Sequence, residues 1–212
     1  MNKERIIEII NSLEIDNTTT QYEISRKIEK LELEDEVICF NGVTKNCPVF
    51  KKENFVLKWA YKSSCFTESL DEAIQECEIY QKAKEQGIEK FFPRTEFFAD
   101  INEVSFIMQE KIDYSCADCS IKTKEKYSKI SKTATDKIFF KMQKGFNIDG
   151  GWLDRDLDSL WAKMAIVLYG KKMCKKLCSF IQENKINDLH GNNLGYKNNH
   201  PIILDFSGYH RS

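Results

Sequence analysis

Three oxygen-bearing side chains near the C-terminus have the types and spacing needed for metal and proton chemistry. Asn193 follows Asp188 by five residues, which lets a loop fold back and turn both side chains toward one cavity. Asp205 directly follows the apolar run 201–204, which is expected to be a buried strand. Carboxylate and amide oxygens suit a hard cation, and a carboxylate can accept a proton from a hydroxyl group. Taken singly, each residue also has an ordinary structural use, as a turn cap, a left-handed loop position or a strand end.

The same residues belong to a longer pattern. The segment 188–193 reads Asp-Leu-His-Gly-Asn-Asn, and after the apolar run the segment 205–208 reads Asp-Phe-Ser-Gly. This order resembles the catalytic loop and the Asp-Phe-x-Gly metal motif of kinase-like phosphotransferases. The form Asp-Leu-His-x-x-Asn is similar in particular to the loop of aminoglycoside and choline phosphotransferases.

The resemblance implies a role for each of the three residues. Asp188 would accept or orient the proton of the attacking hydroxyl, and Asn193 and Asp205 would hold Mg²⁺ against ATP. His190 stands where serine/threonine kinases have a lysine, so the implied acceptor is not a peptide. Phosphoryl transfer depends mainly on positioning and on charge stabilisation, which such a set of residues would supply.

A lysine in the N-terminal half is a candidate for phosphate binding. Lys58 ends the sequence Val-Leu-Lys, which resembles the Val-Ala-x-Lys strand whose lysine binds the α and β phosphates. A lysine on an apolar strand otherwise extends its ammonium group to solvent. Its fitting partner is a glutamate on the following helix, and Glu76 shares a helix face with Tyr80 and Ala83. Glu72, one turn earlier, is the second choice.

The resemblance also implies nucleotide contacts at Glu110, Ile112 and Gly42. The strand 104–112 resembles the segment that enters the hinge between lobes, where backbone groups of Glu110 and Ile112 would pair with adenine. An ordinary edge strand is the alternative interpretation. Gly42 is the one glycine of the loop 41–48, which would cover the phosphates. Close backbone approach favours several glycines, so this loop is expected to hold nucleotide less tightly.

Two further departures from the family pattern concern the acceptor. Ile186 and Asn187 replace the His-Arg that precedes the catalytic Asp, so no arginine would pair with a phosphorylated activation loop. The sequence continues for four residues after Gly208, so no activation segment or peptide-binding helices are expected there. Peptides are therefore predicted to be poor acceptors.

A sheet and several helices are expected to position these residues. Short extended runs separated by turn signals lie at 37–40, 48–50, 55–60, 95–98 and 104–110. Helical patterns lie at 3–13, 68–86, which Gly87 would end, and 157–183. The expected class is α+β, a two-lobe protein-kinase-like fold with a five-stranded antiparallel sheet and one helix in its first lobe. The expected domains are an N-terminal helical extension 1–36, a sheet lobe 37–112 and a reduced, mostly helical lobe 113–212.

Composition narrows the classes of partner. The 212 residues carry a formal net charge of −1, so bulk electrostatic attraction to nucleic acid or to an anionic membrane is not expected. No apolar run is long enough to span a bilayer. Eight cysteines without the spacing of a secreted disulfide scaffold predict reduced thiols and a cytoplasmic protein. A protein partner remains open.

Two cysteine pairs and an acidic cluster could suggest other metal sites. The cysteine pairs are Cys116 with Cys119 and Cys174 with Cys178, and together they would offer four thiolates to zinc. We favour core positions for them. The acidic cluster consists of Asp154, Asp156 and Asp158, for which capping of a helix N-terminus is the preferred interpretation.

Two segments lie outside the resemblance. The helices expected before residue 36 could form half of a DNA-binding winged helix, but Glu23, Glu29 and Glu32 oppose a basic recognition surface. The lysine-rich segment 113–155 is a candidate substrate-facing insertion, with a solvated helical cover as the alternative.

The resulting hypothesis is an ATP-dependent phosphotransferase that uses Mg²⁺ and acts on a hydroxyl group of a non-peptide acceptor, which is either a small molecule or a macromolecule. The alternative is a pseudokinase, a nucleotide-binding regulatory or interaction module without turnover. The glycine-poor loop favours the alternative. The full set of ionisable site residues favours catalysis.

Overall fold

The computed structural model divides the chain into two compact units. The first comprises Met1–Glu78, Arg94–Lys111 and His210–Ser212, and the second comprises Ile79–Pro93 and Ile112–Tyr209. The structure describes residues 3–14, 19, 23, 26–27, 37–41, 46–50, 55–60, 72–101, 104–110, 112, 159–186, 189, 193–204 and 206.

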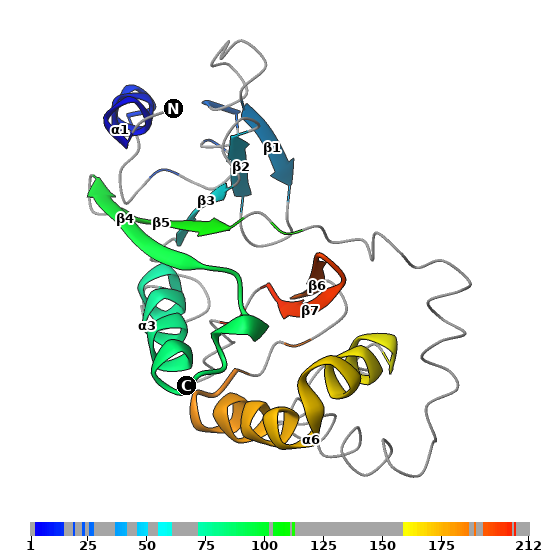
Figure 1. Ribbon diagram of the computed structural model, residues 1–212. Coiled ribbons are helices and arrows are strands. Elements are labelled where there is room, and N and C mark those ends of the chain that lie inside the picture. The colour runs from blue at the N-terminus through cyan, green and yellow to red at the C-terminus, as the bar shows by residue number, and fades with distance from the viewer. Residues whose placement is uncertain are drawn as a thin grey trace. The chain divides into compact units, whose positions relative to one another are not determined.

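An antiparallel sheet organises the first unit (Figure 1). Its strands, in the spatial order β1-β2-β3-β5-β4, are β1 (Val37–Asn41), β2 (Asn46–Phe50), β3 (Phe55–Ala60), β5 (Val104–Glu110) and β4 (Thr95–Ile101). Neighbouring strands differ in how many residues they pair. Strands β2 and β3 pair at only two positions, where Val49 lies opposite Val56 and Phe50 lies opposite Phe55. By contrast, β3 and β5 pair along the whole of β3.

Helix α1 (Lys3–Ser12) belongs to the same unit and forms because its apolar residues recur at helical spacing. The side chains that this spacing places on one face are all buried: Ile6, Ile9, Ile10 and, just after the helix, Leu13. On the exposed side Arg5 and Glu8 form an ion pair of 3.0 Å, one turn apart.

Helix α3 (Glu72–Glu85) follows the sheet strand that carries Lys58. It ends as predicted at Gly87, which has a φ of 65°, the left-handed conformation that glycine adopts without steric cost. The amide of Ile88 donates to the carbonyl of Ala83, and that of Gly87 donates to Lys84. These two bonds form a Schellman motif, which satisfies the last carbonyls of the helix.

Helix α6 (Ser159–Glu183) dominates the described part of the second unit. The sequence predicted one continuous helix here, but Gly170 interrupts it with a φ of 80° and a ψ of 159°. Because glycine has no Cβ, the chain can take this conformation and resume helical geometry afterwards. The short 3₁₀ helix η1 (Glu89–Phe91) also belongs to this unit. The largest fully buried side chains of the core around them are Phe91, Trp161, Phe180 and Phe206.

A β-hairpin, of which the sequence predicted the second strand but not the first, also belongs to the second unit. Its strands are β6 (Leu194–Lys197) and β7 (His200–Ile203). The two residues between them, Asn198 and Asn199, have φ values of 49° and 63°. Positive φ at both positions is the mark of a type I′ turn, in which asparagine is favoured. The indole of Trp161 in α6 donates to the carbonyl of Ile202 at 3.2 Å and ties the hairpin to the helix.

The predicted fold class requires correction. In the described residues of the second unit the long helix α6 is joined by the two-stranded β6–β7 sheet, of which the sequence predicted the second strand and not the first. The sequence predicted one five-stranded antiparallel lobe with its own helix. In the structure the β1–β2 pair is connected to the other strands through only two residue pairs between β2 and β3. Helix α3 is divided between the units, because Cys77 packs against Ile107 of the sheet, whereas Ile79 and Ala83 pack in the second core. The two-lobe kinase-like class is therefore not supported.

Candidate functional site

Lys58 lies in β3 and its side chain is buried, with 8% of the residue exposed. The register pairs it with Ile107 of β5. Residues directly opposite each other in an antiparallel ladder point to the same face of the sheet. Ile107 is fully buried and contacts Cys77 of α3, so this face is the one that the first turns of α3 cover. The ammonium group of Lys58 is thereby directed toward the helix and not to solvent.

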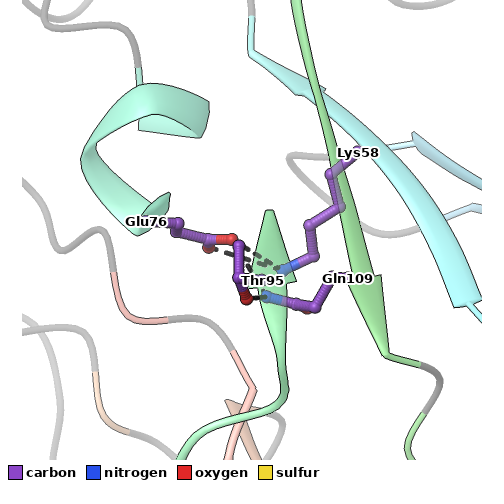
Figure 2. A network of polar contacts seen from close by, with 4 residues as sticks. All are labelled: Lys58, Glu76, Thr95 and Gln109. Atoms are coloured by element: carbon purple, nitrogen blue, oxygen red, sulfur yellow. Dashed lines mark hydrogen bonds and ion pairs between the residues drawn. The ribbon is translucent and has the colours of Figure 1, made fainter. Parts of the chain in front are cut away.

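Glu76 of α3 receives this ammonium group, as the sequence predicted (Figure 2). The Nζ atom of Lys58 lies 3.4 Å from Oε1 and 3.3 Å from Oε2 of Glu76, so the cation contacts both carboxylate oxygens. Glu76 is 1% exposed. Tyr80 and Ala83, which were expected to share its helix face, are partly and fully buried respectively. The helical spacing thus identified which glutamate points inward; the role of this pair in catalysis stays a prediction.

Two polar residues that the sequence did not single out complete the network. Gln109 of β5 donates from Nε2 to Oε2 of Glu76 at 3.2 Å and to Oγ1 of Thr95 in β4 at 3.1 Å. Both are buried. The side chains of these four residues, carried by β3, β4, β5 and α3, point toward one another (Figure 2). Gln109 stands two positions after Ile107 and therefore lies on the same face of the sheet. A polar residue on the buried face of an apolar strand was the sequence feature that could have identified Gln109 as part of the network.

The energetics of the pair favour a functional explanation. Moving two charges out of water carries a desolvation penalty of several kcal/mol per ion, which their mutual attraction offsets only with good geometry and further hydrogen bonds. Hydrophobic residues of similar volume are often equally stabilising or more so. The network instead keeps a cation in a fixed orientation on a strand. A lysine ammonium held in this way suits the binding of phosphate oxygens.

The two residues predicted to contact adenine fall in different units. The backbone amide of Glu110 donates to the carbonyl of Arg94 at 2.8 Å, which is part of the pairing of β5 with the start of β4. This amide is thus occupied within the sheet, so a contact with adenine at Glu110 would have to use its carbonyl. Ile112 belongs to the second unit, where it is buried with Ile202 and Leu204.

Asn193 lies at the base of the β6–β7 hairpin and is buried, with 8% exposed. Its carbonyl accepts a hydrogen bond of 2.8 Å from the amide of Leu204, which extends the register in which Leu194 opposes Ile203. The hairpin therefore brings Asn193 beside the residue that precedes position 205. Phe206 anchors the chain just beyond, because it is fully buried and packs edge-to-face on Phe92 at 5.0 Å.

Several predicted site residues lie outside the described part of the chain: Gly42, Asp188 and Asp205. The same holds for Cys116, Cys119, the acidic cluster Asp154, Asp156 and Asp158, and the segment 113–155. Of the residues that are described, the structure brings Lys58 and Glu76 together in the first unit and places Ile112 and Asn193 in the second.

The remaining cysteine pair consists of core residues, as favoured from the sequence. Neither Cys174 nor Cys178 forms a disulfide bond, and both are buried in α6. Burial, with a smaller contribution from Cys178, raises the pKa of the Cys174 thiol to about 12. The thiol is therefore protonated at neutral pH and is a poor metal ligand in that form. Among the described residues no group of three or more His, Cys, Asp or Glu side chains could hold a metal ion.

Within the described part of the chain, no helix has the length and apolar character needed to cross a membrane. Comparison of the sequence and structure with protein-family models, curated proteins and solved structures yields no match.

Proposed function

We propose that the chain is an ATP-dependent phosphotransferase that transfers the γ-phosphoryl group to a hydroxyl group of a non-peptide acceptor. The observation that carries the proposal is the buried ion pair of Lys58 and Glu76. The strand-borne lysine and helix-borne glutamate are two of the parts that the resemblance to kinase-like phosphotransferases requires. The motifs at 188–193 and 205–208 would supply the other parts.

Each residue has a distinct part in this proposal. Lys58 binds the α and β phosphates of ATP, and Glu76 holds the lysine ammonium in place for that contact. In the C-terminal segment, Asn193 and Asp205 supply oxygen ligands for Mg²⁺, and Asp188 orients the acceptor hydroxyl. Bound Mg²⁺ would neutralise charge on the phosphates. The Asn193–Leu204 hydrogen bond places Asn193 beside Leu204, the residue that directly precedes Asp205 in the sequence.

Two features of the sequence support a non-peptide acceptor and a cytoplasmic location. His190, two positions after Asp188, matches the loop of phosphotransferases that act on small molecules and favours a hydroxyl compound over a peptide. Eight cysteines without a disulfide-scaffold spacing favour the cytoplasm.

Release of ADP from Mg-ATP, measured with and without a panel of small hydroxyl compounds, tests the proposed function. We expect Mg²⁺-dependent release by the parent and a loss of about 100-fold in Lys58→Met, because a charge that stabilises the phosphates is removed. Lys172→Met, at an exposed position of α6, is the matched control and should retain the parental rate. Absence of release by the parent, or a parental rate in Lys58→Met, would contradict the proposal. Binding of Mg-ATP without release would identify the nucleotide-binding module instead.

A further inference from the structure

Gln109 makes two hydrogen bonds with one nitrogen atom, and together they fix its amide. The Nε2 atom carries two hydrogens, and its two acceptors are Oε2 of Glu76 and Oγ1 of Thr95. An ionised carboxylate only accepts hydrogen bonds, so the amide must present its NH₂ group to Glu76. Gln109 is 3% exposed and Thr95 is 4% exposed, so water does not compete effectively for these bonds.

The backbone makes this arrangement rigid. The register places Gln109 opposite Thr95 of β4 on one side and opposite Val56 of β3 on the other. Val56 is two positions before Lys58, so all three strands contribute to the same face of the sheet. A glutamate carboxylate on a helix has three side-chain torsions that its contacts must fix. The hydrogen bond from Gln109, whose amide is itself held by Thr95, adds a directional constraint to the contact with Lys58.

We propose that Gln109, supported by Thr95, is a positioning residue that holds the Glu76 carboxylate in the orientation that aims Lys58 at the phosphates. The catalytic part of this inference rests on the proposed function. Its structural part, that a donor at position 109 fixes Glu76, is independent of any activity. Partners one contact removed from the reacting group typically change activity by 10-fold to 100-fold when they are lost.

The first test replaces the donor without changing the size of the side chain. Gln109→Met should lower kcat for ADP release about 10-fold and change the KM for ATP by less than about 2-fold, because orientation and not binding is lost. Thr95→Val should lower kcat less, and Thr95→Ser, which keeps the hydroxyl, should recover most of that loss. Ser105→Ala is the matched control. It removes a hydrogen bond to Asp100 from a buried position of the same strand without touching Glu76.

The second test makes the donor depend on pH. In Gln109→Glu the new carboxyl group can donate to Glu76 only when protonated, and when ionised it repels that carboxylate. The groups that face this position are Lys58 from β3, Glu76 from α3 and the hydroxyl of Thr95 from β4. Burial and the like charge raise the pKa of the new group above its unfolded value, so the folded state is favoured at low pH and loses stability as pH rises.

The measurement is the Tm of Gln109→Glu and of the parent as a function of pH, in the absence of nucleotide. Relative to the parent, the Tm of Gln109→Glu should fall by about 5 °C or more between pH 5 and pH 8. A Gln109→Glu variant whose Tm follows the parental pH profile would overturn the inference whether or not the chain is an enzyme. Gln109→Met with parental kcat, in a chain that Lys58→Met inactivates, would overturn it as well. If the parent releases no ADP but Gln109→Glu shows the pH-dependent Tm, the positioning stands and the proposed function fails.

Discussion

Lys58→Met is expected to lower the free energy of unfolding by about 3 to 5 kcal/mol, because it removes one partner of a buried ion pair. The reason is that the Glu76 carboxylate, 1% exposed, would remain buried without its cation. The measurement is chemical denaturation at neutral pH, followed by a signal from the folded state. Lys172→Met, which alters an exposed lysine of α6, should stay within about 0.5 kcal/mol of the parent.

A double-mutant cycle separates the ion pair from general disruption of the sheet. Glu76→Gln keeps the shape of the side chain and its capacity to accept from Gln109, but removes the charge. Lys58 Nζ lies 3.3 Å from Oε2 of Glu76, so the two charges should be coupled. The double variant Lys58→Met with Glu76→Gln should then lose about 2 kcal/mol less free energy of unfolding than the sum of the losses in the two single variants. Additive effects would show that the two side chains are not coupled.

Asp205→Ala and Asp188→Ala are expected to separate metal binding from turnover. Asp205→Ala should abolish the Mg²⁺-dependent part of ATP binding, because the cation that bridges the phosphates loses its charged ligand. Asp188→Ala should bind Mg-ATP nearly like the parent yet lower ADP release by about 1000-fold, since it acts on the acceptor hydroxyl and not on ATP.

Calorimetric titration with ATP, with and without Mg²⁺, combined with the ADP assay checks this separation. Asp100→Ala is the control, because the Asp100 carboxylate accepts from Ser105 and belongs to no proposed site. Binding of Mg-ATP by both Asp205→Ala and Asp188→Ala with parental affinity would mean that the C-terminal motif has been assigned the wrong role.

The contact of Lys58 with Glu76 could be predicted because it depends on two simple periodicities. A strand alternates its side chains, and a helix repeats its inward face every three to four residues, so Glu76, Tyr80 and Ala83 had to face the same way. Gln109 and Thr95 could not be placed by the same reasoning. Their meeting depends on the register between β4 and β5, which is set by tertiary packing and not by either strand alone.

The errors in the second unit have physical reasons as well. The apolar pattern of α6 continues through Gly170, and periodicity alone does not reveal that the backbone leaves the helical region there. The sequence of β6 carries little strand signal of its own, because Gly195 interrupts the run of side chains by which a strand is recognised. The pair Asn198-Asn199 was the signal for a hairpin turn, since asparagine tolerates the positive φ that a type I′ turn requires.

The most direct test of the central claim, that the Lys58–Glu76 network serves nucleotide binding, is the thermal stability of the parent and of Lys58→Met during titration with Mg-ATP. Ligand that binds only the folded chain raises the unfolding free energy by about 3 kcal/mol at a hundredfold excess over Kd. The account predicts a concentration-dependent rise in Tm for the parent that requires Mg²⁺ and is lost or strongly reduced in Lys58→Met. No rise for the parent, or the same rise in both proteins, would contradict it.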